Sequence, residues 1–186
     1  YRGNAGSLTL QGGTLTTGAG TLQVNGPVSS LADANASVIQ GRLHLGQYTR
    51  VVDVADGTAA DDLWIQAVII GGSSGSPPFV IDAGLTKTGA GTLRLSGDNT
   101  YGGLTTISDG CLIAATDYAL GLDTGGVSVN DPGRLELVDA QIGPKRLSLS
   151  TPAVHGVVLA ARGDCGWAGR VMLNEIVTVD AADTIS

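Results

Sequence analysis

Apolar and polar residues alternate in short runs along the whole chain, and glycine, asparagine or aspartate follows most of these runs. Because successive side chains of a β-strand point to opposite faces, each run predicts a short strand with one Leu/Val face and one polar face. Apolar residues nowhere recur at helical spacing over two or more turns, so the sequence predicts an all-β fold with essentially no helix. The clearest runs are 7–10, 21–24, 42–45, 63–68, 92–95, 134–137, 146–149 and 176–179.

The expected strands are shorter than those of most sandwiches and barrels, which use about five or six residues per strand. Glycine supplies 29 of the 186 residues and aromatic residues only 4%, so the core is aliphatic and the corners are frequent. This combination favours a β-solenoid, in which each coil stacks on the coil before it. At roughly 20 residues per coil, the length predicts about nine coils. We expect one solenoid segment over residues 1–186.

Charge and hydropathy exclude two classes of partner. The net charge is −7 and no basic cluster is present, so nucleic-acid binding is not expected. The longest apolar runs, 67–70 and 156–161, are far shorter than the roughly 20 residues of a membrane-spanning helix. The sequence therefore predicts neither a nucleic-acid partner nor a membrane span.

The hexapeptide Thr-Gly-Ala-Gly-Thr-Leu occurs at residues 17–22 and again at 88–93. A recurring strand–corner–strand unit is typical of solenoids. The second copy belongs to a longer pattern over residues 84–115. There, Gly-Leu-Thr-Lys-Thr-Gly is followed by Leu-x-Leu-x-Gly-x-Asn-Thr-Tyr and then by a closing Gly-x-Leu.

This ordered pattern closely resembles the autotransporter-associated β-strand repeat of passenger-type proteins. Two positions depart from it: Cys111 stands where threonine or alanine is usual, and Leu104 where a small polar residue is common. The resemblance implies a right-handed parallel β-helix in a large secreted or surface-attached bacterial protein. It does not imply an enzyme, since such repeats mostly form stalks that carry or present another part; we expect a structural segment with no catalytic activity of its own.

Six residues of this segment are expected to hold structural positions. The Asn-Thr-Tyr block predicts a corner at which the asparagine amide satisfies backbone groups of a neighbouring coil. The glycines are expected at turns that need a left-handed backbone or a close approach of two chains. The six residues are Asn99, Thr100, Tyr101, Gly89, Gly91 and Gly110.

Four aspartates are the best candidates for acid–base chemistry or for a Ca²⁺ site: Asp53, Asp56, Asp61 and Asp62. Polysaccharide-cleaving enzymes use paired carboxylates. On a strand, however, Asp61 and Asp62 would point to opposite faces and could not act together. We interpret the four as solvated turn acids and predict no catalytic residue, no cofactor and no metal.

The histidines and cysteines do not predict a catalytic site either. His44 and His155 lie inside alternating segments, and no nucleophile elbow accompanies them. Cys111 and Cys165 are 54 residues apart. That separation is two to three coils, about 10–14 Å, whereas a disulfide needs Cα atoms within roughly 7 Å. We therefore expect two free thiols, and expect residues 71–79, which interrupt the strand rhythm, to form a protruding loop.

The sequence thus predicts a structural segment of a secreted or cell-surface bacterial protein: a rigid spacer, an adhesin stalk or a filament-forming subunit. Two alternatives remain open. One is a carbohydrate-active or carbohydrate-binding β-helix that uses the aspartates, and the other is an extracellular fibre module that stacks end to end. The expected partners are the rest of a longer chain or identical copies at the solenoid ends, with extracellular polysaccharide as a further candidate.

Overall fold

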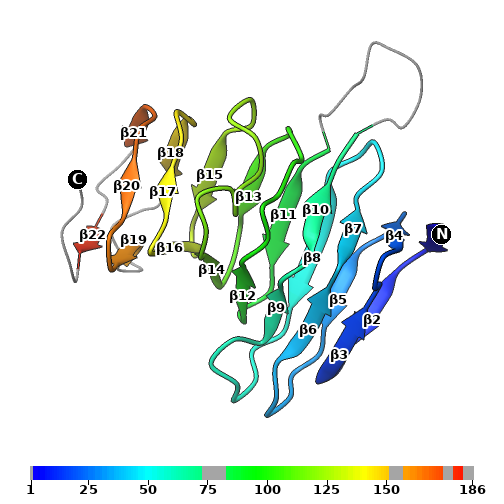
Figure 1. Ribbon diagram of the computed structural model, residues 1–186. Coiled ribbons are helices and arrows are strands. Elements are labelled where there is room, and N and C mark those ends of the chain that lie inside the picture. Colours follow the sequence, from blue (N-terminus) through cyan, green and yellow to red (C-terminus); the bar gives the residue numbers. More distant parts are fainter. Residues whose placement is uncertain (1, 73–82, 151–156, 174–177, 182–186) are drawn as a thin grey trace.

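The computed structural model describes residues 2–72, 83–150, 157–173 and 178–181. Within these ranges the regular structure consists of 22 short strands and contains no helix. All the strand pairs are parallel, and Figure 1 shows the strands stacked side by side from β1–β3 at one end to β21–β22 at the other. The predicted all-β parallel solenoid is confirmed.

Two long sheets of eight strands each run the length of the solenoid. Sheet B contains β2 (Leu8–Leu10), β5 (Val28–Ser30), β8 (Arg50–Val54), β11 (Leu85–Thr88), β13 (Thr105–Ile107), β15 (Val127–Asn130), β18 (Leu147–Ser150) and β21 (Val171–Leu173). Sheet C contains β3 (Gly13–Thr16), β6 (Ser37–Gln40), β9 (Leu63–Ile65), β12 (Thr92–Leu95), β14 (Cys111–Ala114), β16 (Arg134–Val138), β19 (Val157–Arg162) and β22 (Thr178–Ala181).

The third side of the coil is less regular. Sheet A covers the first coils with β1 (Arg2–Ala5), β4 (Thr21–Val24), β7 (Arg42–His44) and β10 (Val68–Ile70). Sheet D covers later coils with β17 (Gln141–Ile142) and β20 (Gly166–Trp167). Between them, residues 96–104 and 115–126 form no strand, yet the Leu122 N–H still donates to the Tyr101 carbonyl at 2.9 Å. Coil-to-coil hydrogen bonding therefore continues on all three sides.

Identical or similar side chains stack in the interior, as the alternation predicts. One inward column of sheet C is made of four leucines in register, each fully buried: Leu63, Leu93, Leu112 and Leu135. Full burial of each such side chain contributes about 1.5–3 kcal/mol. The core is thus a set of aliphatic columns parallel to the solenoid axis.

The prediction of about nine coils is too high, because the coils differ in length. Leu85 pairs with Thr105, twenty positions later. Val52, by contrast, pairs with Lys87, thirty-five positions later. With eight strands in each long sheet and about 4.8 Å per step, the stack is about 34 Å long.

The two copies of Thr-Gly-Ala-Gly-Thr-Leu occupy different corners of the coil. The first copy joins β3 of sheet C to β4 of sheet A, whereas the second joins β11 of sheet B to β12 of sheet C. The hexapeptide therefore encodes a local strand–corner–strand geometry that is independent of its place around the coil.

The predicted loop at 71–79 falls, beyond Gly72, outside the described residues, and so does His155. In the part of the chain that the structure describes, no helix is long and apolar enough to cross a membrane.

Candidate functional site

Asn99 joins three successive coils through its side-chain amide. Its Oδ1 accepts a hydrogen bond from the Ile69 N–H at 2.7 Å, and its Nδ2 donates to the Ala119 carbonyl at 2.6 Å. Ile69 lies one coil before Asn99 and Ala119 one coil after it, and Asn99 itself is 1% exposed. Residues 96–104 form no strand, so this side of the coil lacks a regular ladder of backbone hydrogen bonds. The Asn99 amide supplies two hydrogen bonds in place of that ladder.

Thr100 and Tyr101 follow Asn99 on the same irregular side. Thr100 is exposed, and its backbone N–H donates to the Ile69 carbonyl at 2.9 Å. Tyr101 is fully buried, and its hydroxyl shares a 2.8 Å hydrogen bond with Oγ1 of buried Thr105. Burial raises the pKa of Tyr101 well above its usual value, so the phenol stays neutral.

The Tyr101–Thr105 pair gives a testable double-mutant cycle. We expect Tyr101→Phe to lower the free energy of unfolding by about 1–2 kcal/mol, because it leaves the Thr105 hydroxyl buried without this partner. Adding Thr105→Val should recover part of the loss, since both polar atoms are then gone. Urea unfolding of the two single variants and the double variant measures the coupling; strictly additive effects would contradict a shared hydrogen bond.

Gly89, Gly91 and Gly110 bring neighbouring coils into close contact at the corner between sheets B and C. Gly89 and Gly110 have φ values of +76° and +64°. A Cβ on Gly91 would lie 2.5 Å from the Ala55 carbonyl oxygen, and one on Gly89 would overlap the Val54 carbonyl oxygen. These glycines therefore permit an approach that any side chain would block.

Lys87 occupies an inward position of sheet B, in register with Val52 and Ile107. The side chain is fully buried, and its Nζ donates to the carbonyls of Thr88 (2.9 Å), Gly89 (2.6 Å) and Asp109 (3.2 Å). The amine thereby holds the turns of two successive coils together. Desolvation lowers the pKa of Lys87 to about 8, and the nearby Asp109 charge partly opposes this shift.

The lowered pKa of Lys87 predicts a pH dependence of stability. Between pH 8 and 10.5 the unfolded lysine still binds a proton that the folded one has released, so Lys87 makes the free energy of unfolding rise with pH there. Compared with Lys87→Met, which has no titrating amine, the wild-type chain should gain roughly 1 kcal/mol per pH unit across this window.

Urea unfolding of both chains from pH 7.5 to 9.5 tests this prediction. Burial raises the pKa of Cys111 to about 11, so Cys111 makes the free energy of unfolding fall as pH rises. Both chains contain Cys111, so its contribution cancels in the difference between their free energies of unfolding. A difference that stays constant with pH would show that the amine titrates normally in the folded state.

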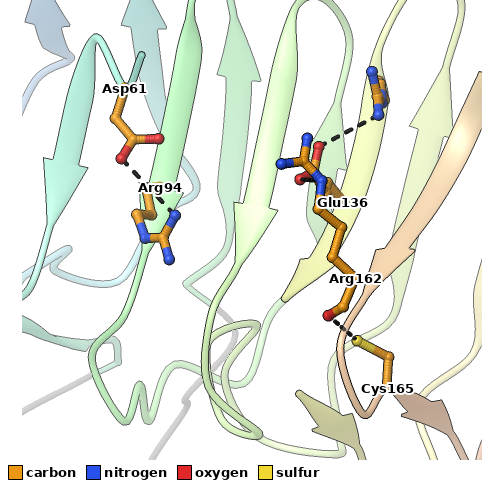
Figure 2. Close-up of polar contacts among 6 residues, drawn as sticks. Asp61, Arg94, Glu136, Arg162 and Cys165 are labelled. Atoms are coloured by element: carbon orange, nitrogen blue, oxygen red, sulfur yellow. Dashed lines mark hydrogen bonds and ion pairs between the residues drawn. The ribbon is translucent and has the colours of Figure 1, made fainter. Parts of the chain in front are cut away.

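The four candidate aspartates do not converge on one site. Asp62 is 5% exposed and acts as a backbone cap: its two carboxylate oxygens accept from the Gly57 N–H (2.8 Å) and the Thr92 N–H (2.7 Å). Asp61 faces Arg94 at 3.9 Å (Figure 2), and Asp53 accepts a hydrogen bond from the Thr88 hydroxyl at 2.7 Å. Asp56 is exposed. Among the described residues, no three histidine, cysteine, aspartate or glutamate side chains gather as a metal site would require.

A second charged cluster lies on the outer face of sheet C. Glu136 is 3% exposed and accepts hydrogen bonds from Arg162 Nε at 2.9 Å and Arg134 at 3.3 Å. Figure 2 shows Arg162 between Glu136 and Cys165, whose Sγ donates to the Arg162 carbonyl at 3.1 Å. Both cysteines are free, as predicted. The two arginines place two positive charges beside one buried carboxylate, so the carboxylate is paired, which is typical of a structural ion pair.

His44 lies at the end of β7, where its Nδ1 accepts a hydrogen bond from the Gly46 N–H at 2.9 Å. This contact closes the local turn.

A comparison with known protein families matches the segment that contains Lys87, Asn99 and Gly110. Residues 85–114 match the sequence profile of the passenger-associated-transport-repeat. Residues 85–114 are thus similar to a passenger repeat, and we call this segment the passenger repeat. The predicted resemblance is confirmed over β11 to β14, the segment that contains Lys87, Asn99 and Gly110.

One curated relative is the adhesin BmaC autotransporter of Brucella suis biovar 1 (strain 1330). The two sequences are 46% identical over 55 residues, which is 29% of this chain and 2% of the relative. The chain therefore corresponds to a small part of that protein's length. No solved structure matches this chain.

The passenger repeat contains one structural residue that the sequence analysis did not single out. Lys87 stands two positions after buried Leu85, so the alternation itself places it in the core. A lysine at an inward position of the alternating pattern, where the other strands have leucine, isoleucine or valine, is the signal that identifies this residue. Glu136 does not carry this signal, because it alternates with Leu135 and Leu137, faces outward and is buried by its two arginine partners.

Proposed function

We propose that this chain is a structural segment of a secreted or cell-surface bacterial protein and acts as a rigid spacer or adhesin stalk. The observation that carries this proposal is the unbroken parallel pairing of eight strands in each of two sheets, with a passenger repeat in its middle. Such a stack has one long axis, and each coil is hydrogen-bonded to the next through both long sheets, which suits a part that holds another part at a distance.

The contacts between coils support a rigid role. Asn99 connects three coils, Asp62 connects two, and Lys87 ties the turns of two. Bending the rod would break these buried hydrogen bonds as well as the backbone ladders, and each buried group left unpaired costs about 1–3 kcal/mol.

The placement of the acids supports a role without catalysis. Asp62 and Asp53 are hydrogen-bonded to other parts of the chain, and Asp61 faces Arg94. Paired catalytic carboxylates would face each other across a shared cleft. If the chain did cleave a polysaccharide and Asp62→Asn abolished the cleavage without unfolding it, the non-catalytic role would be wrong.

Two measurements test the proposal. In the native bacterium, antibodies against this segment should label intact cells or the culture medium; labelling that requires permeabilised cells would contradict the location. In the purified chain, duplicating residues 85–104 should insert one coil in register, because Leu85 and Thr105 are paired. X-ray scattering should then show a rod longer by about 4.8 Å, whereas a more compact particle would contradict a spacer.

A further inference from the structure

A groove of about 430 Å³ lies on the outer face of sheet B, where β13, β15 and β18 run side by side (Figure 1). Its volume lies within the roughly 300–1,000 Å³ of ligand sites. The lining includes Leu104, Thr124, Gly126, Ser128, Arg146 and Ser148 and contains no acidic residue. In a chain of net charge −7, a groove without acids and with an arginine at its edge is a distinct local environment.

The groove exists because one position in a column of outward-facing residues is glycine, which has no side chain. The residues just before β13, β15 and β18 are Leu104, Gly126 and Arg146, and they align along the axis because the strands that follow them are in register. Leu104 is 50% exposed, and its Cδ1 would lie 3.5 Å from a Cβ on Gly126. Gly126 therefore leaves a gap between a leucine and an arginine.

Hydroxyl groups line the gap. The Thr124 hydroxyl donates to the Gly102 carbonyl at 3.3 Å, and the Ser128 hydroxyl donates to Asn130 Oδ1 at 3.2 Å. With their protons directed to the protein, both oxygens can accept hydrogen bonds from a ligand. Ser128 and Ser148 are in register, so their oxygens repeat along the axis once per coil, about every 4.8 Å.

Arg146 and Arg170 place two positive charges next to each other along the same column. They precede Leu147 and Val171, which pair in register. Both arginines are exposed, and within the described part of the chain their guanidinium groups form no hydrogen bond or ion pair. Like charges one coil apart repel each other, and an anion between them removes this repulsion.

We propose that this groove binds an acidic saccharide. A carboxylate of the sugar pairs with Arg146 and Arg170, the sugar hydroxyls donate to Thr124 and Ser128, and an apolar sugar face lies on Leu104. An acidic peptide strand fits less well, because β13, β15 and β18 are already paired with each other and offer no free backbone edge. This inference goes beyond the spacer role and does not depend on it.

Calorimetric titration of the purified chain with oligogalacturonate tests the proposal, with the same oligomer as its neutral methyl ester and with polyglutamate as comparisons. We expect binding of the acidic sugar alone. Arg146→Ala should weaken binding about fivefold, and Arg146→Ala with Arg170→Ala at least tenfold. Gly126→Leu, which fills the gap, should abolish binding.

Matched variants away from the groove provide the controls. Arg42→Ala removes an exposed arginine at the start of β7, and Gly6→Leu adds a side chain at a glycine with no atom within 4 Å of its Cβ. Both should bind like the wild-type chain. The proposal is overturned if the wild-type chain does not bind oligogalacturonate, binds the ester or polyglutamate equally well, or loses binding equally in the control variants.

Discussion

Asn99→Ala is expected to lower the free energy of unfolding by about 4 kcal/mol, because it leaves two buried backbone groups unpaired at about 1–3 kcal/mol each and removes packed atoms. The two groups are the Ile69 N–H and the Ala119 carbonyl, which belong to different coils. Asn99→Asp should not recover the loss, since an ionised carboxylate accepts from Ile69 but cannot donate to Ala119.

Unfolding in urea, followed by circular dichroism, measures this effect. The neighbouring exposed positions give matched controls: Asp98→Ala and Thr100→Ala should each change stability by less than about 0.5 kcal/mol. An Asn99→Ala effect as small as that of the controls would show that the amide does not hold the coils together.

Gly110→Ala is expected to destabilise the fold by about 3–5 kcal/mol or to prevent folding, through two separate effects. The φ of +64° is unfavourable for alanine, and its Cβ would lie 2.5 Å from the carbonyl oxygens of both Gly89 and Gly91. Because both oxygens belong to the backbone of the coil below, the clash can be relieved only by separating the coils.

Gly13→Ala isolates the first effect. Gly13 has a similar φ of +76°, but no atom lies within 4 Å of the position of its Cβ. Gly13→Ala should therefore lower the free energy of unfolding by only about 1–2 kcal/mol. Comparison of the two denaturation midpoints measures the contribution of the close coil contact, and equal midpoints would mean that the left-handed conformation alone demands glycine at residue 110.

Much of the local structure could be predicted from the sequence. The runs at 21–24 and 92–95 form β4 and β12 with the predicted boundaries. Alternation is a property of residues two positions apart, so it can be read without knowing which strands become neighbours. The aliphatic composition and the frequent glycines then favoured a narrow stacked coil.

The length of each coil could not be predicted in this way. The coil from Val52 to its partner Lys87 has thirty-five residues, whereas the coil from Leu85 to its partner Thr105 has twenty. The composition of a segment does not say how many residues lie between two strands of one column. A uniform coil of roughly 20 residues therefore predicts more coils than the structure has.

The short strands, the glycine corners and the aliphatic filling could be predicted from the sequence, because they depend on neighbours along the chain. The corner that each motif occupies depends on how the coils stack: the same Thr-Gly-Ala-Gly-Thr-Leu joins sheets C and A in one coil and sheets B and C in another. The tertiary structure also decided that Lys87 and Asn99 find their partners in adjacent coils. The reason is physical: register between coils arises from contacts 20 or more residues apart, and such contacts exist only once the coils have stacked.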